Sequence, residues 1–126
     1  MFAKTPEELH RMWAQAFASG DVQGALACYE PDAVLMAQPG QLVQGHQAIN
    51  DALAGMLSAR PHFDFEFQRA VEMGDLALLY SRWKLSGTTP DGGTFEFSGQ
   101  TSDVARRQHD GTWLVAIDNP YGGQGI

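Results

Sequence analysis

The first twenty residues carry the pattern of an amphipathic helix with clear signals at both ends. Thr5 followed by Glu8 forms a capping box, and Pro6 suits the first helical turn. Gly20 favours the end of the helix, because glycine readily adopts the left-handed conformation found after a last helical turn. The apolar positions recur at helical spacing and predict one buried face, made of Leu9, Met12, Trp13, Ala16 and Phe17.

The stretch Gly20–Met36 predicts the passage from helix to sheet. Asp21 is a suitable N-cap for a second, short helix, and Pro31 with Asp32 favours a turn after it. The apolar run Ala33–Met36 is typical of the start of a strand. The helical positions that share one face here are Val22, Ala25, Leu26 and Tyr29.

A third helix is predicted from about Gly45 to Ser58. The segment Gln38–Gln41 before it is a turn with proline at its second position, and Pro61 closes the helical region. The apolar residues between these limits are again helically spaced: Ile49, Ala52, Leu53, Met56 and Leu57.

Beyond Pro61 the apolar positions change to a period of two, which is typical of half-buried strands. Phe63, Phe65 and Phe67 alternate with polar residues in a strand that opens at His62. Glycine-rich segments and a tight hairpin at 108–111 separate the later strands. Those strands are predicted at Leu76–Ser86, Thr94–Arg107 and Thr112–Asn119.

Three helices followed by successive strands indicate an α+β fold. We expect a curved antiparallel β-sheet, shaped like a cone, with three N-terminal-half helices packed on its concave face. An apolar pocket would lie between the helices and that face. Residues 1–126 would form a single domain, and the glycine-rich tail at 121–126 would be flexible.

The outer face of such a sheet needs cover, and a homodimer is the usual solution. Alternation along two strands predicts which side chains would face the partner. They are Leu76, Leu78 and Tyr80 on one strand and Leu114 and Ala116 on the last.

Composition narrows the classes of function. The chain has 126 residues, a formal net charge of −7 and a pI of about 4.8. This charge argues against binding to nucleic acid or to an anionic membrane. The N-terminus has no apolar run that could form a signal peptide or a membrane span, so we expect a cytoplasmic protein.

The motifs of common cofactor sites are missing from the sequence. Cys28 is the one cysteine, which excludes an internal disulfide, and we expect it to be a buried thiol in the second helix. The histidines follow no metal-binding spacing, and neither a phosphate-binding glycine loop nor a nucleophile elbow occurs. We therefore expect no metal ion and no cofactor.

Four segments of the chain resemble one known superfamily. They read WAQAFASGDVQGALACYEPDAVLM, QPGQLVQGHQAI, GDLALLYSRWKL and RRQHDGTWLVAIDN, in this order along nearly the whole chain. They are similar to the nuclear-transport-factor-2-like superfamily, in its SnoaL-like and ketosteroid isomerase-like branch, which has a cystatin-like fold. The resemblance implies this fold but no single function, since the fold hosts isomerases, cyclases, hydrolases, dehydratases and binding modules.

Asp103 is the first candidate for chemistry. Alternation puts it on the same strand face as Phe95, Phe97 and Thr101, so its carboxyl could point into the pocket. A carboxyl in apolar surroundings has a raised pKa, and its protonated form donates a hydrogen bond. The segment also resembles the isomerase segment with a protonated oxyanion-hole aspartate, a mechanism known from that enzyme. The structural alternative is an ion pair with an arginine: Arg82, Arg106 or Arg107.

Trp13 and His62 complete the catalytic candidates. Trp13 stands where the isomerase pattern has a donor tyrosine, and its N–H could polarise an oxygen, although a tryptophan at helical core spacing is more often simply packed in the core. The isomerase base falls at Ala37, which cannot abstract a proton, so steroid-type isomerisation is disfavoured. His62, at the start of a strand, is the substitute base, or else a surface histidine.

Further residues are ligand-binding candidates by alternation and resemblance, although most of them suit an ordinary core equally well. They are Phe17, Tyr29, Met36, Met56, Trp83, Ile117 and Asn119. Three functions remain open: an isomerase-, cyclase- or hydrolase-like enzyme acting on a small apolar molecule, a non-catalytic binding module for such a ligand, and an association domain.

Overall fold

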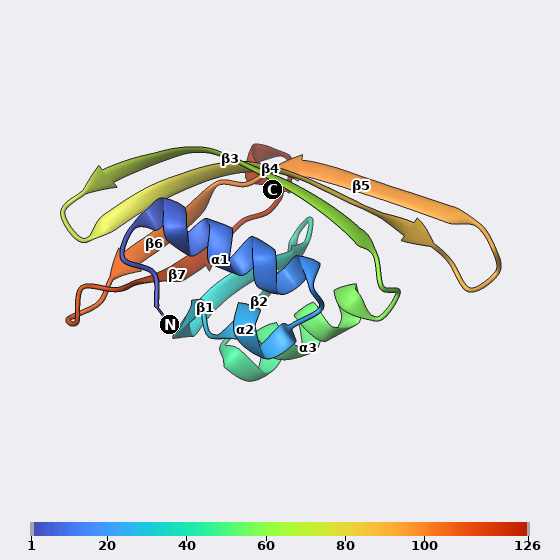
Figure 1. Cartoon of the computed structure of the whole chain (residues 1–126), viewed down its shortest axis with the longest axis horizontal. Helices are drawn as coiled ribbons and strands as arrows, with labels where there is room; N and C mark the ends of the chain where they lie inside the picture. Colours follow the sequence, from blue (N-terminus) through green and yellow to red (C-terminus); the bar gives the residue numbers. More distant parts are fainter. Residues whose placement is uncertain (1, 126) are drawn as a thin grey trace.

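The chain forms a curved sheet with three helices against its concave face (Figure 1). This computed structural model describes residues 2–125. The helices are α1 (Pro6–Ala18), α2 (Val22–Leu26) and α3 (His46–Leu57), with a short 3-10 turn, η1 (Gly122–Gly125). The strands are β1 (Tyr29–Gln38), β2 (Gln41–Gln44), β3 (His62–Met73), β4 (Leu76–Thr88), β5 (Thr94–Gln100), β6 (Asp103–Arg107) and β7 (Trp113–Asp118).

The strands belong to one open sheet. Their order is β2-β1-β7-β6-β4-β3. β6 pairs with the first part of β4, and β5 pairs with the later part of the same strand. β1 and β7 run parallel, and the other described pairs are antiparallel. The predicted α+β fold with a curved sheet and three helices on its concave face is confirmed, with one parallel pairing in an otherwise antiparallel sheet.

The helix ends follow the signals in the sequence. The Thr5 side chain accepts a hydrogen bond from the Glu8 backbone N–H at 3.1 Å, and Pro6 opens α1. The Glu8 carboxylate in turn accepts from the Lys4 N–H at 2.8 Å. Asp21 caps α2 by accepting from the Gly24 N–H at 2.9 Å. These contacts satisfy backbone donors that the first helical turn leaves unpaired.

The second helix is shorter than its apolar spacing predicts. It ends at Leu26, so Cys28 lies after it, and Tyr29 opens β1 instead of closing the helix. Pro31, expected at a turn, lies within β1. The reason is tertiary, because the Val115 N–H of β7 donates to the Cys28 carbonyl at 2.8 Å and draws this segment into the sheet.

Two irregularities set which side chains face inward. The predicted strand Thr94–Arg107 is broken at residues 101–102, where the chain passes from β5 to β6. In β7 the register shifts by one residue: Val104 pairs with Ile117, but Ala105 pairs with Val115. The extra residue, Ala116, forms a β-bulge, and a bulge reverses the alternation beyond it.

The core lies between the helices and the concave face. Its largest fully buried side chains are Tyr29, Leu9, Leu35, Ile49, Leu53, Leu79 and Val115. In the described part of the chain, none of the helices has the length and apolar character needed to span a bilayer.

The segment after β7 returns across the end of the sheet. Tyr121 donates from its hydroxyl to the Ala37 carbonyl at 3.4 Å, and η1 follows. This segment covers most of the tail predicted to be flexible, and Ile126 lies outside the described residues.

Candidate functional site

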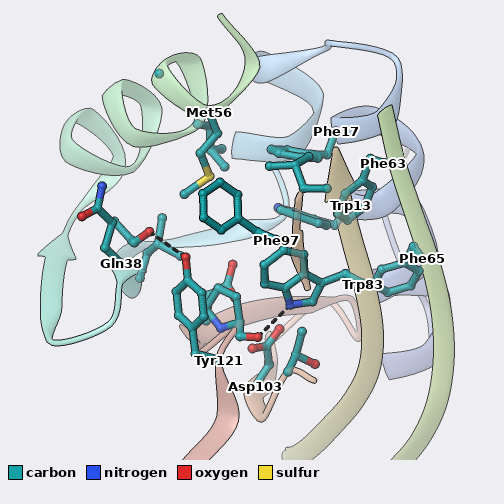
Figure 2. A pocket seen from close by; sticks show the side chains of 18 of the residues that line it. Trp13, Phe17, Gln38, Met56, Phe63, Phe65, Trp83, Phe97, Asp103 and Tyr121 are labelled. Carbon is teal, nitrogen blue, oxygen red and sulfur yellow. Dashed lines mark hydrogen bonds between the residues drawn. The ribbon is translucent and has the colours of Figure 1, made fainter. Parts of the chain in front are cut away.

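A cavity of about 580 Å³ lies between the helices and the concave face of the sheet. Figure 2 shows Asp103 at one end and Met56 of α3 at the other, with aromatic side chains between them. Its size is within the range of small-molecule sites. The lining residues are His10, Trp13, Phe17, Leu35, Ala37, Gln38, Pro39, Leu53, Gly55, Met56, Ala59, Phe63, Phe65, Trp83, Leu85, Phe95, Phe97, Thr101, Asp103, Val115, Asp118, Pro120 and Tyr121.

Aromatic rings form much of the cavity wall. Trp13 and Phe17 of α1 stack with ring centres 4.9 Å apart, and Phe63 of β3 meets Phe17 edge-on at 4.8 Å. On the other side, Trp83 of β4 and Tyr121 meet edge-on at 5.9 Å. Such rings offer flat apolar surfaces, so the wall suits a ligand with rings of its own.

The segment after β7 forms part of this wall, and glycine allows its close approach. The Trp83 indole donates to the Pro120 carbonyl at 2.7 Å. A Cβ on Gly99 of β5 would lie 2.8 Å from that carbonyl oxygen, and one on Gly122 would lie 2.8 Å from the Gln100 carbonyl oxygen. Both distances are too short for any side chain, so these glycines let the segment pack closely against β5.

A cluster of ionisable side chains lies at the inner end of the cavity. His10 of α1, Asp103 of β6 and Asp118 of β7 are all buried, and each lines the cavity. Among residues 2–125, neither lysine nor arginine lines it. The site therefore offers hydrogen bonds and proton transfer, but no cation that could hold an anionic group.

Asp103 is held from three sides. Its Oδ1 accepts from the Asn119 backbone N–H at 2.7 Å, and its Oδ2 lies 2.8 Å from His10 Nε2. The Asp118 carboxyl makes a third hydrogen bond to it. Asp103 does not form the alternative ion pair with Arg106 or Arg107. Arg106 pairs with Glu30 at 3.0 Å, and Arg107 pairs with Asp75 at 2.7 Å.

Asp118 is anchored by the core tyrosine at the start of β1. The Tyr29 hydroxyl donates to Asp118 Oδ2 at 2.5 Å. Burial, followed by the charge of Asp118, raises the pKa of this hydroxyl well above its ordinary value, against a lowering contribution from the neighbouring Trp13 indole. Its N–H nevertheless falls outside hydrogen-bonding geometry and has no partner in the described part of the chain.

Burial sets the protonation states of this cluster. It raises the pKa of Asp103 to about 7, against the hydrogen bonds from Asn119 and Asp118 that lower it. Burial, followed by the charge of Asp103, raises the pKa of Asp118 well above its ordinary value. It lowers the pKa of His10 to about 4, so His10 is neutral at pH 7 and the His10–Asp103 contact is no ion pair.

The structure places five of the predicted site residues at the cavity. Asp103, Trp13, Phe17, Met56 and Trp83 all line it. Tyr29 lies directly behind the cavity wall and contacts it through Asp118.

The other predicted residues lie elsewhere. His62 is 72% exposed in its side chain and contacts Asp64 at 3.0 Å. Met36 is not among the residues that line the cavity, whereas Leu35 and Ala37 on either side of it are. Ile117 is 45% exposed, because the bulge at Ala116 turns it outward.

Asn119 contributes its backbone to the site. Its N–H holds Asp103, while its side-chain amide donates to the Gly122 carbonyl at 2.9 Å. The side-chain oxygen is buried and has no partner in residues 2–125.

The sequence reasoning missed His10 and Asp118. His10 precedes Trp13 by three residues and Phe17 by seven, so helical spacing already places it on their face. Asp118 carries no such signal, since regular alternation from Val115 points Ile117 inward instead. The described residues contain no group of three or more histidine, cysteine or acidic side chains placed to hold a metal ion.

Solved structures with the same fold come from several bacteria. A ketosteroid isomerase-like protein from Erwinia carotovora atroseptica matches with a TM-score of 0.78 and 21% identity, covering 89% of this chain and 88% of its own. A proposed calcium/calmodulin-dependent protein kinase type II association domain from Thiobacillus denitrificans matches at 0.75 and 16%, covering 94% of both chains. At these identities the likeness shows the fold alone.

A third structure gives the same picture. A proposed dehydratase of the NTF2-like family from Streptomyces avermitilis matches with a TM-score of 0.72 and 14% identity, covering 87% of this chain and 88% of its own. A comparison with curated proteins gave no match. The family model of the SnoaL-like domain matches residues 9–115, which is most of the sequence. The chain therefore belongs to the SnoaL-like domain family.

Proposed function

We propose that this protein is an enzyme that moves a proton within a small, uncharged and largely apolar molecule, as an isomerase or cyclase does. One observation carries the proposal: two buried carboxyls, Asp103 and Asp118, contact each other at the inner end of an aromatic cavity. Two such groups do not stabilise an ordinary core, because burying a carboxyl is unfavourable unless it is fully hydrogen-bonded.

The two carboxyls have different environments, which suits them to different tasks. Asp103 has a pKa of about 7, so a large fraction is ionised at neutral pH and can accept a proton. Asp118, whose pKa is raised well above its ordinary value, stays protonated and can donate a hydrogen bond. The oxyanion-donor role that the sequence suggested for Asp103 thus fits Asp118 better, and Trp13 remains a second candidate donor.

The chemistry follows from these two roles. In the resting site the one O–H of Asp118 points to Asp103. A substrate carbonyl would take over this hydrogen bond as a C–H bond beside it breaks and its proton forms an O–H bond on Asp103. The electron pair of that bond moves into the enolate, whose oxygen the donors stabilise. Return of the proton from Asp103 to another carbon completes an isomerisation without any change of oxidation state.

The lining limits the class of substrate. Without a lysine or arginine at the cavity, a phosphate or carboxylate group would lose its hydration without compensation. The facing rings of Trp13, Phe17, Trp83 and Phe97 favour cyclic or aromatic molecules. Small cyclic enones and aryl ketones combine both properties.

Hydrogen–deuterium exchange tests the proposal without a known substrate. The protein is incubated in D₂O with a panel of cyclic enones and aryl ketones, and deuterium incorporation beside the carbonyl is followed by NMR. We expect at least one ketone to exchange, and Asp103→Asn to slow that exchange by roughly 100-fold or more. The matched control is His62→Gln, which changes an exposed residue that does not line the cavity and should leave the rate unchanged.

A binding module would give a different result. Ketones would then bind in the cavity, as detected by ligand-observed NMR, while exchange stayed at the rate of the solvent control. Equal exchange by wild type and Asp103→Asn would likewise remove Asp103 from the reaction.

A second proposal concerns assembly. Five exposed apolar side chains lie on neighbouring strands and form what we term the outer apolar patch: Val71, Met73, Leu76, Leu78 and Ile117. Such a patch favours a homodimer through the outer face of the sheet, as expected from the sequence. Ala116, also predicted there, is buried within its own chain.

Light scattering after gel filtration tests this assembly. Leu78→Lys should yield a monomer where the wild type is a dimer. The control Leu42→Lys changes another exposed leucine, on β2 and outside the patch, and should leave the mass unchanged. A monomeric wild type would contradict the proposal.

A further inference from the structure

The hydroxyl of Ser81 has a single hydrogen-bond partner. Ser81 is fully buried on β4, and its Oγ lies 2.8 Å from His10 Nδ1, with no other side-chain or backbone partner in the described part of the chain. A hydroxyl proton in a dry interior must be directed at an acceptor. The Ser81 O–H therefore donates to His10 Nδ1.

This donation decides the tautomer of His10. When Nδ1 accepts, the one proton of the neutral imidazole sits on Nε2 and donates to Asp103 Oδ2 at 2.8 Å. Each ring nitrogen has one hydrogen-bond partner in the described part of the chain, Ser81 Oγ for Nδ1 and Asp103 Oδ2 for Nε2, among the groups that face His10. These groups are Ser81 on β4, Asp103 on β6, Asp118 on β7 and the ring edges or faces of Phe65 and Phe67 on β3.

The same groups as in a serine–histidine–aspartate triad occur here in the reverse order. In a triad the serine meets the substrate, and the aspartate orients the histidine from behind. Here Asp103 lines the cavity, while Ser81 has no exposed surface and does not line it. Ser81 cannot act as a nucleophile from this position, so its role must reach the cavity through His10.

We propose that Ser81 is a positioning residue that fixes His10 as a permanent donor, so that every protein hydrogen bond at Asp103 points toward its carboxylate. His10 Nε2–H, the Asn119 backbone N–H and the Asp118 carboxyl are the three donors. Calling Asp103 the base rests on the function proposed above, whereas the direction of these hydrogen bonds can be tested without a substrate.

The arrangement has a consequence for the transferred proton. After Asp103 takes a proton from the substrate, its new O–H finds donors on the protein side: His10 Nε2–H and the Asn119 N–H. Neither of these donors can accept it, and among the groups that contact Asp103 only the Asp118 carboxyl, which itself lines the cavity, has an acceptor oxygen. The proton thus stays on the cavity side of Asp103, which is what a transfer between two atoms of one molecule requires.

Nitrogen-15 NMR of the histidine rings reads the tautomer directly, because protonated and unprotonated ring nitrogens have widely separated shifts. We expect His10 to show a proton on Nε2 alone, both well below and well above the pH at which Asp103 titrates. A proton on Nδ1 alone, or a doubly protonated ring as Asp103 titrates, would overturn the proposal. The signal is assigned by its loss in His10→Gln.

Ser81→Ala tests the origin of the fixed tautomer. In wild type, a proton on Nδ1 would leave the Ser81 O–H without an acceptor. Without the hydroxyl, this penalty against the Nδ1–H tautomer disappears. With Asp103 protonated, His10 Nε2 then gains an O–H donor, so the second tautomer should appear at low pH. Ser86→Ala, on the same strand but outside this network, is the matched control and should keep the wild-type spectrum. A wild-type spectrum in Ser81→Ala would show that Ser81 does not fix the ring.

Two variants of His10 separate donation from mere packing. Gln can donate its amide N–H to Asp103 and accept from Ser81, whereas Leu fills similar space without either bond. His10→Leu should raise the titration midpoint of Asp103, followed by carboxyl ¹³C NMR, by roughly one pH unit or more, the size of a charge-assisted hydrogen bond. His10→Gln should keep the wild-type midpoint. Equal midpoints in Gln and Leu would contradict a donor role, and should Leu fail to fold, the wild-type tautomer decides.

These outcomes separate this inference from the proposed function. A fixed Nε2–H tautomer in a protein that exchanges no ketone would support the positioning role of Ser81 and contradict the proposed enzyme function. Exchange by a protein whose His10 carries its proton on Nδ1 does the reverse.

Discussion

The two ends of the cavity are built differently. At the inner end, β6 lies between β4 and β7, and the carboxyls of Asp103 and Asp118 are held by hydrogen bonds from several elements. At the other end, β5 pairs with β4 alone, and Phe97 on it is 58% exposed (Figure 1). The inner end is held by strand pairing on both sides, whereas β5 is held by pairing on one side only.

This difference separates two tasks within one site. Proton transfer depends on positions held to a fraction of an ångström, which the paired strands provide. Recognition of the rest of a ligand depends on apolar contact, which tolerates small movements of Phe97 and Met56. Changes at the inner end should therefore alter the rate, and changes at the β5 end should alter affinity.

The largest expected effect on the rate comes from the two carboxyls at the inner end of the cavity. Asp103→Asn removes the base and should reduce ketone exchange by roughly 10²–10⁴-fold. Asp118→Asn keeps an oxygen for the Tyr29 hydroxyl and an N–H for Asp103, so it should stay within about tenfold of wild type. Exchange rates at saturating ketone measure both. Equal losses in the two variants would mean that the carboxyls act as one unit.

The pH dependence follows from the base. Because Asp103 must be ionised to accept a proton and its pKa is about 7, the exchange rate should rise with pH and level off above that value. Well below the midpoint, each pH unit should change the rate by about tenfold. The profile is measured at saturating ketone. A rate that falls as the pH rises through this range would assign the acid role to Asp103.

The β5 end is probed by Phe97→Ala. Loss of one aromatic contact should weaken ketone binding by up to about tenfold, while exchange at saturation stays unchanged. Titration by ligand-observed NMR gives the affinity. Leu42→Ala, an exposed apolar residue on β2, is the control. A lower exchange rate at saturating ketone with unchanged affinity would contradict the assignment of rate to the inner end and affinity to the β5 end.

The smallest expected effect concerns stability. The folded pKa of Asp118 is raised well above its ordinary value of 3.8, so the unfolded chain loses this proton first and folded stability falls as the pH rises above 3.8. Asp118→Asn cannot ionise and should escape this loss. The melting temperature of the variant minus that of wild type should therefore increase as the pH rises. A difference independent of pH would mean that Asp118 is ionised in the fold.

Local signals in the sequence predicted much of the fold. Thr5 and Glu8 place the start of α1, and the alternation of Phe63, Phe65 and Phe67 identifies β3, because both patterns depend on neighbouring residues alone. Asp103 also lies on the predicted face, although a break at residues 101–102 interrupts its strand. That break preserves the alternation, so Thr101 and Asp103 are both buried.

The missed parts depend on distant residues. Tyr29 suits a helix by spacing, but pairing with Val115 on β7 makes it the start of a strand. His10 has a helical position that gives no hint of Ser81 and Asp103, which are 71 and 93 residues away. His62 opens its strand as predicted, but alternation with the inward-facing Phe63 puts it on the exposed face, away from the cavity.

The extra residue in β7 has a wider consequence. Because Ala116 is taken up as the extra residue, Asp118 points into the cavity and Ile117 points out. If Ala116 instead paired regularly with Val104, alternation from Val115 would turn Ile117 inward and Asp118 outward, and a hydrocarbon would replace the acid. The same amino-acid sequence would then line an inert container, so the reactive site depends on one irregular backbone pairing as well as on the acid itself.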